Sequence, residues 1–223
     1  MRVCESTNDL ARELAAAGAP AGTVVTAGEQ TAGRGRQGGS WSAPPGAALL
    51  YSALLRPLEK RHLLLPLAVP LAVCETVEEL SSRETEVKWP NDVWIDGRKT
   101  AGILIEARPQ DGWAVIGVGL NVAIAPGDFP PELRESATSV GAGATVPAAL
   151  AALNGRLGEW VAAEPDAVLA AFRERDALRG RRISWERGSG TAEGIDERGN
   201  LLVRRPDGGV EALGAGEVHL DLR

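Results

Sequence analysis

Residues 30–41 read Gln30-Thr31-Ala32-Gly33-Arg34-Gly35-Arg36-Gln37-Gly38-Gly39-Ser40-Trp41, and the class of fold depends on how this stretch is interpreted. Its glycines match the G-x-G-x-x-G spacing at Gly33, Gly35 and Gly38. A dinucleotide-binding fold needs a helix to begin at such a loop, with the pyrophosphate at the helix N-terminus. Here the loop continues into SWSAPPG at 40–46, which cannot begin a useful helix. The stretch therefore argues against a Rossmann fold and predicts a flexible loop.

The same loop carries two guanidinium groups, Arg34 and Arg36, on either side of a glycine. Glycine lets backbone amides approach an anion closely, and arginine adds bidentate donors that are always charged. ATP or an acyl phosphate suits such a loop. On this segment alone, a solvated loop or an RNA contact of the RGG type is an equally good interpretation.

The composition is that of a globular protein, and it argues against a disulfide framework, a histidine metal site and a general attraction to nucleic acid. The chain has 223 residues, of which 44% are hydrophobic and 24% charged, and a net charge of −6. Length allows a main domain with a small appendage, and the negative charge gives no general attraction to nucleic acid. Two cysteines, Cys4 and Cys74, are too few for a disulfide framework, and two histidines disfavour a histidine metal site.

The most apolar run, Leu63 to Cys74, is interrupted by two prolines and is too short to cross a bilayer. It predicts a buried helix. Because no signal peptide is visible either, we expect a cytoplasmic protein with no membrane partner.

Helix and strand patterns follow one another as far as about residue 175. Besides the buried helix, we expect helices from Ser6 to Gly18, over 148–163 and in the segment that Asp166 can cap. Asp96-Gly97 predicts a tight hairpin turn. The expected strands are 23–26, 47–55, 87–89, 93–95, 103–105 and 115–118. From about residue 179, short β-like runs between glycine turns predict a small separate β-barrel. We therefore expect domains at 1–175 and 176–223.

Three further segments place polar groups at strand ends. Lys88-Trp89-Pro90-Asn91-Asp92 puts a cation, an aromatic ring and a carboxylate at one corner, although such a sequence also serves simply as a turn. In residues 97–106, a basic pair that includes Lys99 leads into an apolar strand that ends at Glu106. The alternative is that Lys99 is simply solvated, as a lysine at a hairpin usually is. Gly117-Val118-Gly119-Leu120-Asn121 places glycines inside a strand, which indicates close approach by a ligand or by another segment.

Together and in this order, these segments resemble the biotin protein ligase family. The matching signatures are Ser6-Thr7-Asn8, residues 33–36, Lys88 to Asp92, Lys99 with Gly102-Ile103-Leu104 and Glu106, Gly117-x-Gly119-x-Asn121 and Ala137-Thr138-Ser139. The resemblance implies an α+β fold, with a catalytic domain like that of class II tRNA synthetases, containing a mixed β-sheet, followed by an SH3-like barrel. It implies that biotin reacts with MgATP to give biotinyl-5'-adenylate. It also implies that biotin is then transferred to a lysine of the biotin carboxyl carrier protein domain of a biotin-dependent carboxylase.

The resemblance also implies roles for individual residues. The catalytic cations would be Arg36, Lys88 and Lys99. Biotin would contact Ser6, Thr7, Asn8, Gln30, Arg34, Gly35, Arg36 and Lys99. ATP would contact Arg36, Trp41, Asn91, Asp92 and Asn121, and Asp92 is the candidate ligand of Mg²⁺, which favours one or two carboxylates beside phosphate oxygens. Capping of the first helix explains Ser6-Thr7-Asn8 without any ligand, and Trp41 could equally be a core aromatic.

Two rival functions remain at this stage. A lipoate or octanoate ligase or transferase would share the core, but the Arg…Gly-Gly-Gly-Ala-Val-x-His pattern is absent and both cysteines lie outside the phosphate-loop motifs. A nucleic-acid-binding module could use the arginine loop and the barrel, but the net charge of −6 argues against this function. The loop carries Gln37 and Gly39 where the family often has further basic residues, so its positive charge is lower. We expect no DNA partner, and a monomer or homodimer.

Overall fold

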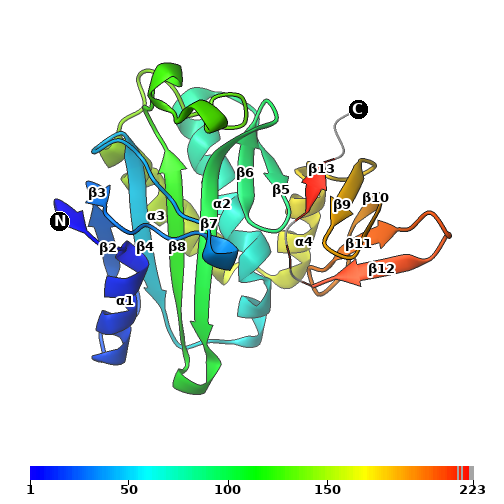
Figure 1. Ribbon diagram of the computed structural model, residues 1–223. Coiled ribbons are helices and arrows are strands. Elements are labelled where there is room, and N and C mark those ends of the chain that lie inside the picture. The colour runs from blue at the N-terminus through cyan, green and yellow to red at the C-terminus, as the bar shows by residue number, and fades with distance from the viewer. Residues whose placement is uncertain (215, 217, 221–223) are drawn as a thin grey trace.

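The computed structural model describes residues 1–214, 216 and 218–220, and shows a large sheet with a smaller sheet beside it (Figure 1). Residues 215, 217 and 221–223, which belong to the predicted barrel, lie outside the described residues. The α-helices are α1 (Thr7–Ala16), α2 (Leu65–Ser81), α3 (Val146–Ala162) and α4 (Pro165–Glu174). Short 3-10 helices are η1 (Arg36–Gly38), η2 (Lys60–Leu64), η3 (Pro109–Asp111), η4 (Pro126–Asp128) and η5 (Pro131–Leu133).

The large sheet has six strands in the order β2-β4-β8-β7-β6-β5, and its five pairings are antiparallel. The strands are β2 (Val24–Ala27), β4 (Ala48–Leu55), β5 (Glu86–Lys88), β6 (Asp92–Ile95), β7 (Arg98–Arg108) and β8 (Trp113–Asn121). Parallel pairing joins β1 (Val3–Cys4) to β3 (Glu29–Gln30) and forms isolated bridges from Val87 to Asp176 and from Lys99 to Ala137. The resulting architecture is an α+β fold of the class II tRNA synthetase type.

The two faces of the large sheet have different partners, because side chains alternate along each strand. On one face, Leu49, Tyr51 and Ala53 of β4 join the main core with α2 and α3, which lie behind the sheet in Figure 1. On the other face, Leu54 packs with residues of α1. Beyond α1, this second face carries the small residues Gly102, Gly117 and Gly119, and at Ala48 and Leu50 it packs with Trp41, Ile124 and Phe129.

The smaller sheet follows α4 and has the strand order β12-β11-β10-β9-β13, as a small barrel-like domain. Its strands are β9 (Arg182–Trp185), β10 (Gly188–Ile195), β11 (Leu201–Arg204), β12 (Val210–Leu213) and β13 (His219–Leu220). It packs against the larger domain, because Ile183 and Leu201 belong to the same core cluster as Val87. The Trp89 indole donates to the Gly199 carbonyl at 3.0 Å, and in the segment between α4 and β9 the Ala177 amide donates to the Val87 carbonyl at 3.0 Å. The division into domains at 175/176 stays a prediction.

Most predicted elements are confirmed, with local corrections. Asp96 and Gly97 both have positive φ (50° and 72°), as the predicted hairpin turn requires. Leu63 is not part of the buried helix, since it lies in η2 with 79% of its surface exposed. The last α-helix is preceded by Glu164 instead of Asp166, because Pro165 takes its first position. None of the described helices is long and apolar enough to cross a membrane.

Candidate active site

The floor of the candidate site is a strip of glycines on the second face of the large sheet, the face against which α1 packs. Gly102 of β7 and Gly119 of β8 are paired across the two strands. A Cβ atom on Gly119 would lie 2.4 Å from the Trp41 ring, and one on Gly117 would lie 2.2 Å from the Asn8 amide oxygen. The predicted close approach at these glycines is therefore made by two other parts of the chain, α1 and the segment after the arginine loop.

A polar network surrounds the start of α1 at one end of this floor. Ser6 precedes the helix, but its side chain makes no capping hydrogen bond, so the capping interpretation of Ser6 is wrong. The Gln30 amide oxygen takes that role instead, accepting from the Thr7 backbone N–H at 2.7 Å and from the Thr7 hydroxyl at 3.0 Å. Both acceptor positions of Gln30 are thus filled, which leaves its amide NH₂ as a donor.

Asn8 is held by both of its side-chain atoms. Its Nδ2 donates to the Leu104 carbonyl at 3.2 Å and to Glu106 at 2.9 Å, and its Oδ1 lies 2.6 Å from the Ser52 hydroxyl. Ser52 is fully buried and also lies 2.8 Å from the Thr7 hydroxyl. Sequence reasoning missed Ser52, although a serine within the apolar run Ala48–Leu55 was a usable signal.

The arginine loop is closed on itself as a short hairpin. Arg34 and Ser40 form an antiparallel bridge, the Gly35 amide donates to the Gly39 carbonyl at 2.7 Å, and the Trp41 amide donates to the Gly33 carbonyl at 2.9 Å. Gly33 is required here, since a Cβ would lie 2.3 Å from the Trp41 carbonyl oxygen. As predicted, no useful helix begins in this loop: η1 is a three-residue 3-10 turn.

The two loop arginines contact different parts of the sheet. Arg34 Nη2 donates to Asp9 and to Glu106, each at 2.8 Å. Arg36 Nη1 donates to the Asn91 amide oxygen at 3.0 Å. Arg34 therefore belongs to the α1 end of the site, and Arg36 to the corner at Lys88–Asp92.

Lys99 lies at the centre of the site. Its ammonium group is 2.7 Å from Asp92 and 5.8 Å from the centre of the Trp41 ring. Lys88 stands over the Trp94 ring at 5.6 Å. The Trp41 indole nitrogen is buried without a hydrogen-bond partner in the described structure, so the site holds a donor that a ligand could satisfy.

Two adjoining cavities open over this floor, of about 320 Å³ and about 500 Å³. The first is lined by every predicted site residue except Asn121, together with Gly216 and Val218 of the small domain. The second is lined by Asn121 and by apolar side chains of residues 124–133. Both cavities share Ser40, Trp41, Lys88, Asp92 and Lys99. Asn121 is held by a hydrogen bond from its Nδ2 to the Thr138 carbonyl at 3.0 Å.

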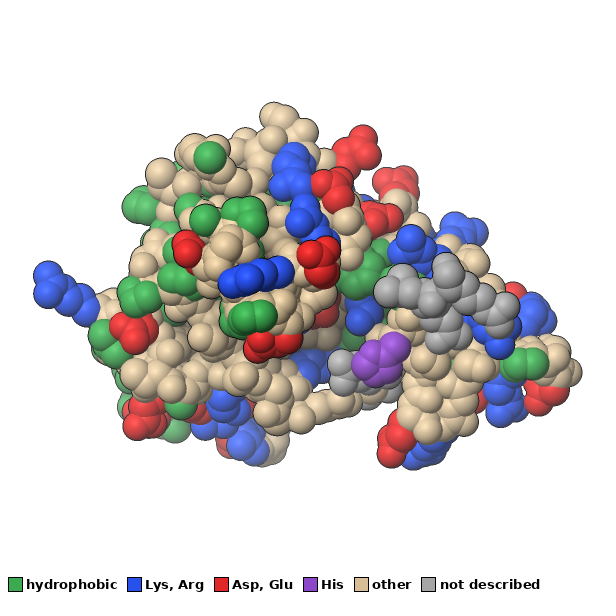
Figure 2. Space-filling model, turned by 45° about the horizontal axis from the view of Figure 1, so that its top comes forward, with side chains coloured by type: hydrophobic (Ala, Val, Ile, Leu, Met, Phe, Trp, Pro, Cys, Tyr) green, Lys and Arg blue, Asp and Glu red, His purple; other side chains and the backbone are tan. Residues whose placement is uncertain are grey.

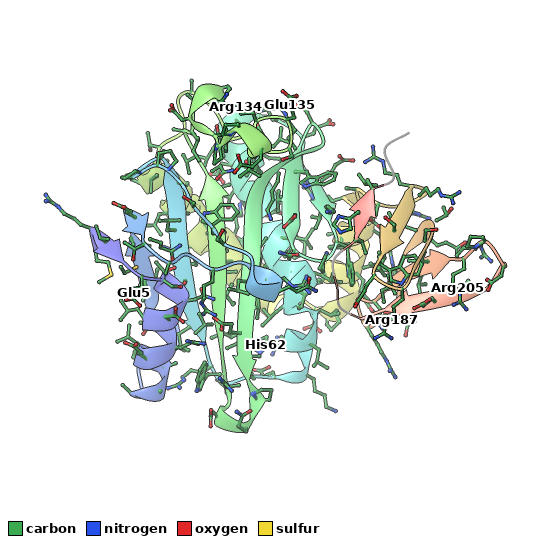
Figure 3. All side chains as sticks on the ribbon, in the orientation of Figure 1. Glu5, His62, Arg134, Glu135, Arg187 and Arg205 are labelled. Carbon is green, nitrogen blue, oxygen red and sulfur yellow. The ribbon has the colours of Figure 1, made fainter. Side chains whose placement is uncertain are left out.

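The cysteines and His62 lie outside these cavities. Cys74 is buried in α2, and burial raises the pKa of its thiol to about 12. Burial also raises the pKa of Cys4. His62 is at the lower end of the molecule in Figure 3 and lines neither cavity. Neither thiol is therefore placed or activated as a nucleophile.

On the face drawn in Figure 2, the described charged side chains do not form the basic stripe that is typical of nucleic-acid-binding proteins. In the view of Figure 2, acidic and basic side chains are intermixed over the described part of that face. Arg187 and Arg205 project from the small domain without turning toward the large sheet (Figure 3). Within the described residues, no group of three potential metal-ligand side chains occurs. Asp92 is the described carboxylate that lines both cavities.

Known proteins resemble this chain in sequence and in fold. "Bifunctional ligase/repressor BirA" of Bacillus subtilis is 44% identical over 144 residues, covering 62% of this chain and 44% of that protein, so this match spans under half of the relative's length. "Biotin--[acetyl-CoA-carboxylase] ligase" of Mycobacterium tuberculosis is 36% identical over 231 residues, covering 96% of this chain and 85% of that one. The structure titled "Biotin protein ligase from Aquifex aeolicus in complex with biotin and ATP" is similar with a TM-score of 0.85 at 27% identity, covering 99% of this chain and 96% of that one.

Two family models also match. Residues 180–221 match the biotin protein ligase C terminal domain, and residues 1–122 match the biotin/lipoate A/B protein ligase family. The match over residues 1–122 covers the arginine loop, the corner at Lys88–Asp92 and the glycine strip. These parts build most of the site. The chain belongs to the biotin/lipoate A/B protein ligase family.

Proposed function

We propose that this protein activates biotin with ATP to biotinyl-5'-adenylate and transfers the biotinyl group to a lysine of a carrier protein. The observation that carries the proposal is the meeting of two cavities at Lys99, with Trp41 and Asp92 beside it. A reaction that joins a carboxylate to the α-phosphate of a nucleotide needs two compartments with fixed positive charge between them.

The first cavity suits the biotin head group. A ureido group offers one carbonyl acceptor and two N–H donors. The Gln30 NH₂ is turned to donate because its oxygen is occupied by Thr7, and the Ser6 hydroxyl can donate or accept. Thr7 and Asn8 complete this end of the cavity, with Arg34 and Gly35 along its side.

Positive charge at the junction suits the reacting carboxylate and phosphate. Arg36, Lys88 and Lys99 line the first cavity, and the two lysines also line the second. Fixed cations there would offset the repulsion between the biotin carboxylate and the polyphosphate and stabilise charge in the transition state. The second cavity, with Asn121 and the apolar residues 124–133, would take the adenosine, and Asn91 would orient Arg36.

A magnesium ion that accompanies ATP needs only one or two protein carboxylates. Asp92 fits this requirement, because it is the described carboxylate that lines both cavities, whereas Asp128 lines only the second. Bound there, the ion would supply further charge neutralisation at the phosphates.

The second half-reaction uses the carrier's lysine as the nucleophile. Its amine attacks the acyl carbon of the adenylate, an amide bond forms and AMP leaves. No enzyme nucleophile is required, which agrees with the position of Cys4 and Cys74 outside the cavities. The proposed partner is the carrier domain of a biotin-dependent carboxylase in the cytoplasm, with the enzyme acting as a monomer or homodimer.

The test is transfer of labelled acid to a purified carrier domain in the presence of ATP. We expect biotin to be incorporated, and a carrier whose target lysine is replaced by arginine to remain unlabelled. Incorporation of lipoate or octanoate in place of biotin would contradict the substrate assignment.

A further inference from the structure

Four charged side chains form a closed cluster beside the first cavity. Arg34 donates to Asp9 and Glu106 at 2.8 Å each, and Arg12 contacts the same two carboxylates at 2.5 Å and 3.1 Å. Each arginine thus bridges both carboxylates, and each carboxylate receives both arginines. Such reciprocal pairing fixes geometry better than an isolated surface ion pair does.

The cluster joins three segments that are far apart in the sequence. Asp9 and Arg12 belong to α1, Arg34 to the arginine loop, and Glu106 to β7. Glu106 also accepts a hydrogen bond from Asn8 at 2.9 Å, through the same oxygen that receives Arg34. One carboxylate therefore positions two of the residues that face the proposed biotin site.

The charges around Glu106 favour its ionised form. Although burial alone raises the pKa of Glu106, hydrogen bonds from Asn8 and Arg34 and the charges of Arg34 and Arg12 hold that pKa below its ordinary value. The carboxylate is thus present at neutral pH to receive both partners.

We propose that Asp9 and Glu106 are positioning residues that preassemble the biotin-facing wall, by holding Arg34 and Asn8 in place before any ligand binds. On this view the two loop arginines have different roles. Arg34 forms part of the biotin site, while Arg36, next to Asn91, binds the phosphates. The role in biotin binding rests on the proposed function; the anchoring of Arg34 does not.

The variants Asp9→Asn and Glu106→Gln, alone and combined, test this inference. Glu13→Gln is the matched control, since Glu13 lies exposed on the same helix and lines neither cavity. Because Arg34 is partly exposed to solvent, each lost ion pair is expected to change an equilibrium by only a few fold. We expect the double variant to raise the KM for biotin about three- to tenfold, with kcat and the KM for ATP changing less than about twofold.

A second measurement needs no substrate. Trypsin cleavage in the ligand-free protein is mapped by mass spectrometry, separating cuts after Arg34 from cuts after Arg36. We expect the double variant to be cut after Arg34 about three- to tenfold faster, with cleavage after Arg36 unchanged and the Glu13 control like wild type. If the double variant does not fold, Asp9→Asn alone, at a half-buried helix position, gives the same comparison at smaller amplitude.

The outcomes are distinct. Unchanged cleavage after Arg34 together with an unchanged biotin KM would overturn the inference. A lower melting temperature together with a lower kcat and similar increases in both KM values would also overturn it. That result would show a merely structural role. If the wild-type enzyme does not use biotin, the proposed function fails, while the digestion pattern still decides whether these carboxylates anchor Arg34.

Discussion

Replacing Lys99 with alanine should remove most of the adenylation activity. The ammonium group lies where the two cavities meet, and its position is fixed by Asp92 at 2.7 Å. A unit charge about 4 Å from the developing phosphate charge contributes roughly 4 kcal/mol at an effective dielectric constant of about 20. Loss of one preorganised donor typically costs about 2.7–4 kcal/mol, or roughly 10²–10³ in rate. Because 35% of the Lys99 side chain is exposed, we expect a loss nearer to a hundredfold.

The assay is the rate of biotin-dependent adenylation with saturating ATP, and Arg98→Ala is the control. Arg98 neighbours Lys99 in β7 but lines neither cavity. The substitution of Lys99 also leaves Asp92 without its cation, so Lys99→Arg, which restores a positive charge beside Asp92, is measured too. If the missing positive charge is the cause, Lys99→Arg retains more activity than Lys99→Ala. Equal, small losses for Lys99→Ala and Arg98→Ala would refute the catalytic role.

Three further predictions follow from other parts of the molecule. Gly119→Ala should displace the Trp41 ring, costing about 1–3 kcal/mol in stability and most of the activity, whereas Gly158→Ala, whose Cβ meets nothing within 4 Å, should cost neither; thermal melts and adenylation rates check both. Burial raises the pKa of Asp176, so its ionised form destabilises the fold at neutral pH, and this penalty disappears as the pH falls below about 4. Asp176→Asn should therefore raise Tm at neutral pH and leave it unchanged in acid; a uniform shift would contradict this. Mobility-shift assays at physiological salt should detect no sequence-specific binding to duplex DNA, given the net charge of −6.

The order of elements was largely predictable because it depends on local signals. Asp96-Gly97 specified its turn through the positive φ angles that both residues tolerate, and the apolar run before Cys74 specified a buried helix. Boundaries were less predictable. Leu63 belongs to the apolar run in the sequence, yet it lies in η2, before α2 begins, and its side chain is exposed to solvent.

Motif order grouped Lys99, Arg36 and Gln30 as candidate site residues, and the structure brings all three to the first cavity; their roles stay predictions. The contacts between the site residues could not be predicted. Motif order could not show that Gln30, instead of Ser6, satisfies the start of α1, or that Glu106 receives Arg34 from 72 positions away. Those contacts depend on how strands and loops meet in three dimensions, for which a single sequence carries no local signal.

The central claim is that biotin is the acid that this enzyme activates, and isotope exchange between pyrophosphate and ATP tests it without any carrier protein. Purified protein is incubated with ATP, labelled pyrophosphate and magnesium, with biotin, lipoate or octanoate in parallel. The account predicts exchange that depends on biotin and falls about a hundredfold in Lys99→Ala. Exchange with lipoate or octanoate but not with biotin would contradict it.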